Sequence, residues 1–223
     1  MIKGILFDFD GTIVDSEHSR YESSKQVLKE YGFDLTQQLW DTTYKSLSSQ
    51  ELFDDVIKQL LLEISSEELY QKAHTQRTQI ENENGVRVIE GFREFYEECK
   101  KNNLQCVVCS GGTTEHVQRI LKSCNIEIQG FGREEYEKRK PFPDAWLRGL
   151  ELLGLNKDEV ILFDDASSGI EAGLRAGIKK CCAINYGEED FKHIEKIEQE
   201  VGVKTYQYFK NWKEVDIHKL IKC

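Results

Sequence analysis

Two patterns of hydrophobic and polar positions divide the chain. Residues 2–9 form a short β-rich apolar run that stops at Asp-Gly-Thr, so a buried strand followed by a turn is predicted. Residues 15–84 contain no proline and one glycine, and they are rich in Gln, Glu, Lys and Leu. Two capping boxes, Ser48-x-x-Glu51 and Ser65-x-x-Glu68, precede segments with helical periodicity. Helices are therefore predicted at about 16–31, 35–45, 48–63 and 65–83.

After Gly85, predicted strands and helices alternate. Strands are predicted at 105–109, 126–131, 159–163, 180–184 and 205–209, and helices at 91–102, 113–124, 143–153 and 168–176. This alternation predicts a parallel sheet covered by helices on both faces. The expected fold is α/β: a doubly wound, Rossmann-like core of residues 1–14 and 86–223, with a small helical bundle of residues 15–85 inserted after the first strand.

Composition and charge narrow the class of protein. The charged fraction is 31%, but 11 Phe, 9 Tyr and 3 Trp supply enough apolar bulk for a core, so extensive disorder is not expected. The longest aliphatic runs have four residues, far short of the roughly 20 that span a bilayer. Asp8 and Asp10 interrupt the segment where a signal peptide would need its apolar stretch. A net charge of −10 disfavours nucleic-acid binding, and seven cysteines without a signal peptide favour the cytoplasm.

Polar residues gather after four predicted strands or loops. Because ligands of open α/β sheets bind beyond the carboxyl ends of the strands, these residues are candidates for one shared site. They are Asp8 and Asp10 in Asp8-Phe9-Asp10-Gly11-Thr12, Ser110 and Gly111 in Ser110-Gly111-Gly112, Lys140 in Lys140-Pro141-x-Pro143-Asp144, and the pair Asp164-Asp165.

Four carboxylates at one rim repel each other and raise each other's pKa values. A hard divalent cation such as Mg²⁺ would remove that repulsion, and its preference for oxygen ligands suits Asp8, Asp10, Asp164 and Asp165. Phosphoryl transfer requires mainly positioning and charge neutralisation. In such a site an Asp carboxylate can be the nucleophile, and a second carboxyl group can serve as general acid and base.

Each motif also has a purely structural interpretation. Asp8 and Asp10 could cap a loop, and Asp164-Asp165 could cap the helix that follows. Lys140 could belong to the solvated charges of 134–140, although the two prolines of the chain flank its loop. Cys106-x-x-Cys109 falls in an apolar strand without a second ligand pair, which favours packed thiols over a zinc site.

The four motifs together resemble those of the haloacid dehalogenase superfamily. The order and spacing fit along the whole chain, and the helical insertion resembles the small helical cap of its β-phosphoglucomutase-like phosphatases. The resemblance implies Asp8 as nucleophile and metal ligand, and Asp10 as general acid/base and as a metal ligand through its backbone carbonyl. Ser110 and Gly111 would bind the phosphoryl group, Lys140 would neutralise charge, and Asp164 and Asp165 would complete a Mg²⁺ site.

The insertion departs from the sugar-phosphate mutases of that group. Those enzymes carry a Lys-Gly-x-x-Arg loop, where this chain has Lys45-Ser46-Leu47-Ser48-Ser49, and a histidine where Arg20 stands here. Since a mutase needs a second phosphate site, the missing arginine argues against mutase activity. Lys45 and Arg20 are candidates for binding a distal anion of the substrate.

The sequence therefore predicts an enzyme, a Mg²⁺-dependent phosphatase that acts on a small phosphomonoester, with sugar phosphates as one candidate class. A phosphomutase of the β-phosphoglucomutase type is the first alternative, and a binding or regulatory module without turnover is the second. The expected partner is a small phosphorylated metabolite, with no nucleic acid and no membrane, and the expected state is a cytoplasmic monomer.

Overall fold

The computed structural model of the protein describes residues 1–45, 47–185, 194–203 and 206–222. The chain divides into two compact units. The core unit consists of Met1–Asp15 and Arg87–Cys223, and the helical unit of Ser16–Val86. Both divisions lie one residue after the positions predicted from the sequence.

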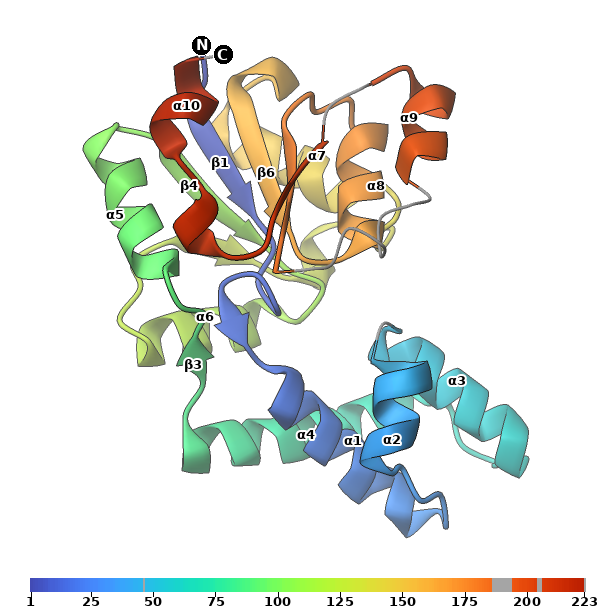
Figure 1. Cartoon of the computed structure of the whole chain (residues 1–223). Helices are drawn as coiled ribbons and strands as arrows, with labels where there is room; N and C mark the ends of the chain where they lie inside the picture. The colour runs from blue at the N-terminus through green and yellow to red at the C-terminus, as the bar shows by residue number, and fades with distance from the viewer. Residues whose placement is uncertain (46, 186–193, 204–205, 223) are drawn as a thin grey trace. The chain divides into compact units, whose positions relative to one another are not determined.

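A six-stranded sheet forms the centre of the core unit, with the strand order β5-β4-β1-β6-β7-β8 (Figure 1). All neighbouring strands in it are parallel. The prediction of a doubly wound, Rossmann-like fold is therefore confirmed. The strands are β1 (Gly4–Phe7), β4 (Gln105–Cys109), β5 (Gln129–Phe131), β6 (Val160–Asp164), β7 (Cys181–Ile184) and β8 (Tyr206–Phe209). The predicted start of the last strand, Thr205, lies outside the described residues.

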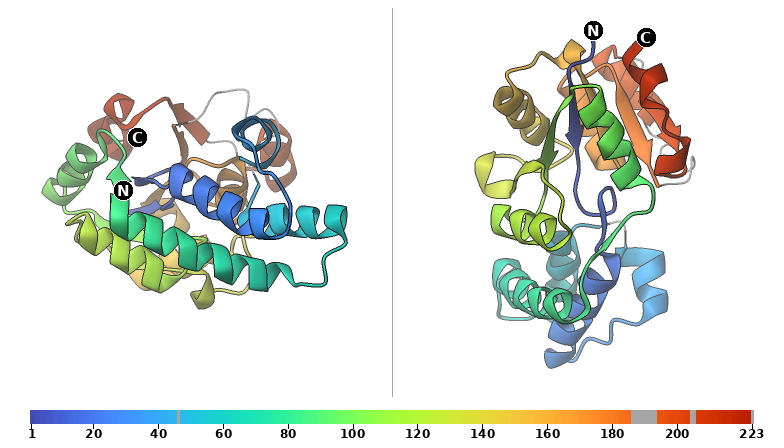
Figure 2. Two further views of the ribbon diagram at one scale, coloured as in Figure 1. Left: turned by 90° about the horizontal axis from the view of Figure 1, so that it is seen from below. Right: turned by 90° about the vertical axis from the view of Figure 1, so that its left-hand side faces the viewer.

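Helices cover the sheet on both faces (Figure 2). They are α5 (Phe92–Lys101), α6 (Thr114–Ser123), α7 (Asp144–Leu153), α8 (Ser167–Arg175), α9 (Ile194–Val201) and α10 (Ile217–Lys222). The first four lie within two residues of their predicted positions. Neither α9 nor α10 was predicted, because helices of eight and six residues show too few turns to reveal a periodicity.

Alternate residues of the strands face the two helical layers. Phe7 and Phe163 pack on one face with Phe95 of α5 and with Trp212, whose ring centroid lies 4.9 Å from that of Phe163. On the opposite face Leu6, Cys109, Leu162 and Cys181 lie in one apolar cluster with residues of α7 and α8. The predicted covering of both faces is thus present: β1, β6 and β7 are buried along their whole length, and β4 is buried from Val107 to Cys109.

The two connections between the units pair with each other inside the core unit. Strand β2 (Val14–Asp15) runs antiparallel to β3 (Arg87–Val88), with Val14 opposite Val88 and Asp15 opposite Arg87. The side chains of Asp15 and Arg87 also form an ion pair. Strands of two residues are too short to show alternating apolar and polar positions, so the sequence did not predict them.

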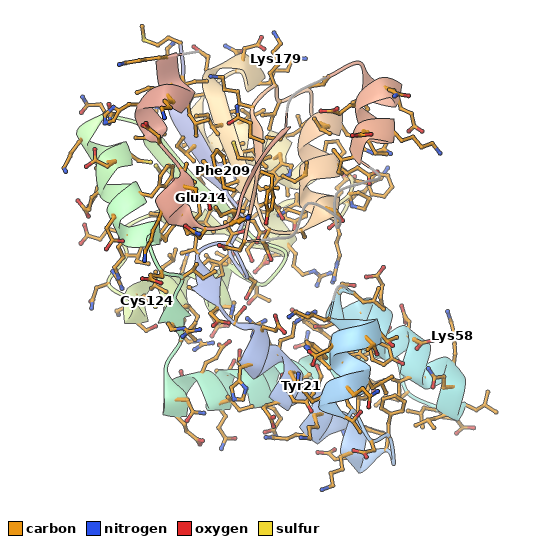
Figure 3. The ribbon with its side chains drawn as sticks, viewed as in Figure 1. Tyr21, Lys58, Cys124, Lys179, Phe209 and Glu214 are labelled. Carbon is orange, nitrogen blue, oxygen red and sulfur yellow. The ribbon has the colours of Figure 1, made fainter. Side chains whose placement is uncertain are left out.

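The helical unit contains α1 (Glu17–Glu30), α2 (Gln37–Leu39), a π-helical turn η1 (Trp40–Tyr44), α3 (Ser49–Leu60) and α4 (Ser66–Asn84). Both predicted capping boxes are present, with Ser48 and Ser65 as the N-caps of α3 and α4. The single helix predicted at 35–45 is instead split into α2 and η1. Trp40 and Tyr44 of η1 are buried in an apolar cluster with Tyr21 of α1, which Figure 3 labels.

Among the residues that the structure describes, no helix is both long and apolar enough to cross a bilayer. The six cysteines described are free thiols, and Cys109 is buried in the apolar cluster beneath α7. This is the packing role predicted for that residue.

Candidate active site

The candidate site lies where the winding of the sheet reverses. From β1 the chain proceeds to β4 and β5 on one side, and from β6 it proceeds to β7 and β8 on the other. Loops that leave adjacent strands in opposite directions open a crevice at the carboxyl edge, which is where such folds bind ligands. Asp8 directly follows β1, and its backbone N–H donates to the Phe163 carbonyl at 2.8 Å, while Asp164 is the last residue of β6. The register therefore brings the two carboxylates together.

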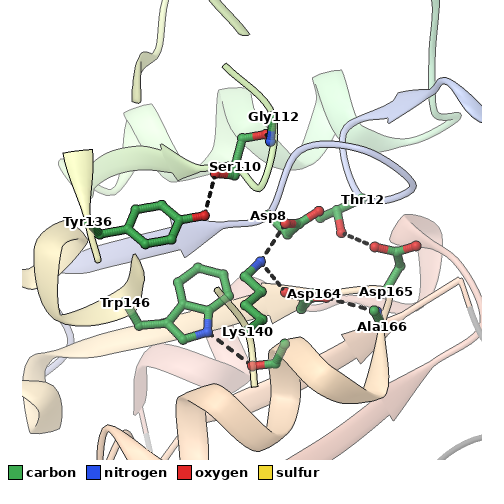
Figure 4. A network of polar contacts seen from close by, with 11 residues as sticks. Asp8, Thr12, Ser110, Gly112, Tyr136, Lys140, Trp146, Asp164, Asp165 and Ala166 are labelled. Carbon is green, nitrogen blue, oxygen red and sulfur yellow. Dashed lines mark hydrogen bonds and ion pairs between the residues drawn. The ribbon is translucent and has the colours of Figure 1, made fainter. Parts of the chain in front are cut away.

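Asp8, Asp164 and Asp165 form an acidic cluster. One carboxylate oxygen from each lies within 4.8 Å of the others. Asp164 is buried, and its Oδ1 accepts a hydrogen bond from the Ala166 N–H at 2.8 Å (Figure 4). Thr12 donates its hydroxyl to Asp165 Oδ1 at 3.1 Å.

Lys140 supplies a positive charge to this cluster. Its ammonium nitrogen lies 2.5 Å from Asp8 Oδ1 and 2.7 Å from Asp164 Oδ2 (Figure 4). The same nitrogen lies 4.2 Å from the ring centroid of Trp146, whose indole N–H donates to the Gly169 carbonyl at 3.0 Å. Trp146, in the first turn of α7, therefore packs against the lysine, a contact that the sequence did not predict.

Burial and mutual repulsion strongly perturb these groups. Burial raises the pKa of Asp8 to about 7, Asp164 adds to the rise, and Lys140 opposes it. Burial, together with Asp8 and Asp164, also raises the pKa of Asp165 well above its ordinary value. Burial alone would lower the pKa of Lys140, but Asp164 and Asp8 outweigh it and raise the pKa. One ammonium thus does not balance three carboxylates.

The donor set fits a Mg²⁺ ion. Three carboxylate oxygens within 4.8 Å of one another are hard oxygen ligands of the kind that Mg²⁺ binds. Burial first, and the neighbouring carboxylates second, raise the pKa values of Asp8 and Asp165, and a divalent cation bound between these carboxylates would favour their ionised forms.

The second motif lies beside Asp8, because β4 pairs with β1 and Val108 is opposite Phe7. Ser110 is fully buried; its Oγ accepts from the Gly112 N–H at 2.9 Å, and its carbonyl accepts from the Tyr136 hydroxyl at 3.0 Å (Figure 4). A side chain added at Gly111 would meet nothing within 4 Å, so this backbone is open to a ligand.

The carboxylate of Asp10 is not one of the three that lie within 4.8 Å of one another, although its charge acts on Asp8. The Asp10 side chain is 32% exposed, and its Oδ1 lies 3.9 Å from Nε2 of the buried His116. A Cβ built at Gly112 would lie 3.3 Å from Ser110 Oγ and 3.9 Å from Asp10 Oδ2, so Asp10 borders the Ser110 loop. Its predicted role as a metal ligand stays a prediction.

Comparisons with known proteins identify the family of the chain. Residues 5–183 match the profile of the family described as "Haloacid dehalogenase-like hydrolase". The chain belongs to the haloacid dehalogenase-like hydrolases. Phosphorylated carbohydrates phosphatase from Thermotoga maritima is 23% identical over 218 residues, covering 96% of this chain and all of the relative. Phosphoglycolate phosphatase from Aquifex aeolicus is 28% identical over 188 residues, covering 81% and 84% of the two chains.

The fold is also similar to that of a solved structure. A crystal structure of β-phosphoglucomutase from Clostridium difficile superposes with a TM-score of 0.79 over all of this chain and 96% of that chain, at 18% identity. The family recognised from its motifs, and an enzyme of the phosphatase type within it, are thus confirmed.

The two candidate residues of the helical unit have local partners in this haloacid dehalogenase-like hydrolase. Arg20 donates to the carbonyls of Leu47 at 2.7 Å and Lys45 at 2.5 Å, and its guanidinium carbon lies 4.5 Å from the Trp40 ring centroid. Lys45 forms an ion pair with Glu17 at 3.0 Å. Both cations thus stabilise the loop after η1, in which Ser46 lies outside the described residues. Their role in substrate binding stays a prediction.

Gly169, in the first turn of α8, is required by the position of Asp164. A Cβ at residue 169 would lie 1.8 Å from Asp164 Oδ2. We expect Gly169→Ala to displace this carboxylate from Lys140 and to lower kcat/KM for phosphate esters by about a hundredfold, since a shift of about 1 Å in an active-site group has that effect.

Gly173→Ala, one turn later in α8, is the matched control. Its Cβ would lie 2.8 Å from Cys181 Sγ and Leu162 Cδ1, which are core atoms. We expect this change to destabilise the fold by about 1–3 kcal/mol without lowering kcat/KM at a temperature where the protein is folded. Equal activity in the two variants would contradict the placement of Asp164 in the catalytic centre.

Proposed function

We propose that this protein is a Mg²⁺-dependent phosphatase that hydrolyses a small phosphomonoester through an aspartyl-phosphate intermediate. The observation that carries the proposal is the contact of Lys140 with Asp8 at 2.5 Å, inside a cluster that also contains Asp164 and Asp165. Sugar phosphates are the favoured class of substrate, because the relative that covers nearly the whole chain is named a phosphorylated carbohydrates phosphatase.

Asp8 is the proposed nucleophile. It directly follows the buried strand β1, and Lys140 and a backbone hydrogen bond to Phe163 fix its position. A carboxylate oxygen of Asp8 forms a bond to phosphorus while the bond from phosphorus to the ester oxygen breaks. Lys140 favours the ionised form of Asp8 and offsets the charge of the incoming phosphoryl group.

Asp10 is the proposed general acid and base. It would donate a proton to the departing ester oxygen and then accept one from the water that attacks the aspartyl-phosphate, which releases inorganic phosphate and restores Asp8. Its partial exposure suits a group that must reach both substrate and water. Ser110 and the backbone at Gly111 would bind phosphoryl oxygens.

Asp8, Asp164 and Asp165 would hold the Mg²⁺ ion, with Asp10 as a further ligand. When bound, this ion neutralises the carboxylates and the phosphoryl oxygens. The helical unit would act as a cap that excludes water and selects the substrate, with Arg20 and Lys45 as anion-binding candidates.

The test is a screen of the purified protein against phosphorylated metabolites and p-nitrophenyl phosphate. We expect release of inorganic phosphate from at least one sugar phosphate with Mg²⁺, loss of that activity with EDTA, and recovery when excess Mg²⁺ is restored. Conversion of a hexose 1-phosphate to its 6-phosphate, dependent on a bisphosphate, would instead identify a mutase. Absence of turnover across the whole panel would favour a binding module.

A further inference from the structure

Two side chains from the last part of the core unit hold the backbone of the first motif. The indole N–H of Trp212 donates to the Thr12 carbonyl at 2.9 Å, across 200 residues of sequence. The side-chain amide of Asn185 donates to the neighbouring Gly11 carbonyl at 2.8 Å. Two successive peptide groups of the loop after Asp8 therefore have their carbonyl oxygens fixed from outside the loop.

Thr12 connects this fixed backbone to the acidic cluster. The Thr12 side chain is fully buried, and its hydroxyl donates to Asp165 Oδ1 at 3.1 Å. The backbone at Gly11 packs closely against the Asp165 carboxylate, because a Cβ at Gly11 would lie 2.0 Å from Asp165 Oδ2. A rotation of the peptide groups at Gly11 or Thr12 would therefore move the Thr12 hydroxyl away from this carboxylate.

Trp212 is itself held rigidly. It is 2% exposed, and its ring centroid lies 4.8 Å from that of Phe95 and 5.4 Å from that of Phe92 in α5. It belongs to the 3₁₀ turn η5 (Trp212–Glu214), whose Glu214 is labelled in Figure 3. A rigid donor fixes an acceptor more tightly than a mobile one, because less conformational entropy opposes the hydrogen bond.

The backbone of Asn185 has a left-handed conformation. Its φ of +65° is in the left-handed region, and its backbone N–H donates to the Phe209 carbonyl at 3.1 Å. Asparagine tolerates this region better than most residues do, and glycine adopts it readily. The position can therefore be tested without changing the backbone.

We propose that Trp212 and Asn185 are positioning residues for the metal site. They fix the Gly11–Thr12 backbone so that the Thr12 hydroxyl holds Asp165 among the carboxylates. Both residues lie beyond residues 5–183, the segment that matches the family profile. This inference rests on the proposed Mg²⁺-dependent function.

The test compares Mg²⁺ binding, measured by isothermal titration calorimetry, in the full-length wild type and three variants. Trp212→Phe keeps the aromatic packing and removes the N–H donor, and Asn185→Gly keeps the backbone conformation and removes the amide. We expect each to weaken Mg²⁺ binding by about tenfold, which is typical when a partner of a metal ligand is lost. The control, Tyr96→Phe, removes a hydroxyl that donates to the Glu127 carbonyl in the same unit and should bind Mg²⁺ as the wild type does.

A double mutant separates positioning from general stability. If Trp212 acts through Thr12, Thr12→Val with Trp212→Phe will bind Mg²⁺ no more weakly than Thr12→Val alone. Saturating Mg²⁺ should restore most of the kcat/KM of Trp212→Phe. Wild-type Mg²⁺ affinity in both Trp212→Phe and Asn185→Gly would overturn the inference, even if both variants melt at lower temperature. Absence of Mg²⁺ binding and turnover in the wild type would instead overturn the proposed function.

Discussion

Replacing Asp8 by asparagine will lower kcat for phosphate ester hydrolysis by about four orders of magnitude or more, as loss of a catalytic nucleophile does. The amide oxygen of asparagine is a poor nucleophile, yet it keeps the size of the side chain and can still accept a hydrogen bond from Lys140. Because burial already raises the pKa of Asp8 to about 7, a neutral side chain at this position should leave the thermal midpoint unchanged or raise it. Steady-state assays with p-nitrophenyl phosphate and thermal melts of the same samples provide the measurement.

Asp158→Asn is the matched control for this change. Asp158 lies in the same unit and forms an exposed ion pair with Lys179 at 2.8 Å. We expect wild-type kcat from it and little change in the thermal midpoint, because exposed ion pairs contribute little to stability. Substantial turnover in a folded Asp8→Asn variant would exclude the aspartyl-phosphate mechanism.

Replacing Lys140 by methionine should affect both activity and stability. Methionine fills a similar volume but leaves Asp8 and Asp164 without their buried ammonium partner. We expect kcat/KM to fall by about 10³-fold, since a positive charge directed at the transferring phosphoryl group is lost. The free energy of unfolding should fall by about 3 kcal/mol at pH 8 without metal, because breaking a buried ion pair leaves uncompensated charge.

The stability loss in Lys140→Met should depend on pH in a defined direction. In the wild type the pKa of Asp8 rises from 3.8 to about 7, so the folded protein binds a proton that the unfolded chain releases between those values. Such a group makes stability fall as the pH rises through this window. Lys140 lowers the pKa of Asp8, so its removal should raise the pKa of Asp8 in the folded variant above that in the wild type. The part of the deficit due to Asp8 should therefore stay level below about pH 7, where Asp8 is protonated in both folded proteins, and grow above it, and Mg²⁺ should reduce it.

Lys179→Met provides the comparison for Lys140→Met. Lys179, labelled in Figure 3, is 66% exposed in its pair with Asp158. Its replacement should change the free energy of unfolding by less than about 1 kcal/mol at any pH in this range. A pH-independent deficit in Lys140→Met, equal to that of Lys179→Met, would contradict the coupling of Lys140 to the buried carboxylates.

The larger elements of the fold could be predicted because their signals are local. The strand Gln105–Cys109 matches its prediction residue for residue, since it is an apolar run bounded by Asn-Leu and Ser-Gly-Gly. The capping boxes at Ser48 and Ser65 mark the starts of two helices within one residue. The pairing of β2 with β3 depends instead on residues more than 70 positions apart, and no local sequence pattern predicts it.

The same distinction applies to the active site. Asp8, Lys140, Asp164 and Asp165 follow predicted strands or flank two prolines, so the topology of an α/β sheet was enough to bring them together. The contacts that hold them come from Thr12, Trp146 and Trp212, whose partners lie up to 200 residues away. Thr12 could have been found as the last residue of its motif. The two tryptophans look like ordinary core residues in the sequence, because only the direction of an indole N–H distinguishes their role.

The antiparallel pairing of Val14–Asp15 with Arg87–Val88 makes the inserted segment an exchangeable module. The two ends of the inserted segment leave the core unit from paired strands. Because the core holds these ends together, a longer or shorter segment between them changes the entropy of loop closure only slightly. Insertions are tolerated where the junctions are adjacent in this way. We therefore expect a chain built on this plan to accept a different inserted segment while Asp8, Asp164 and Asp165 stay together in the core unit.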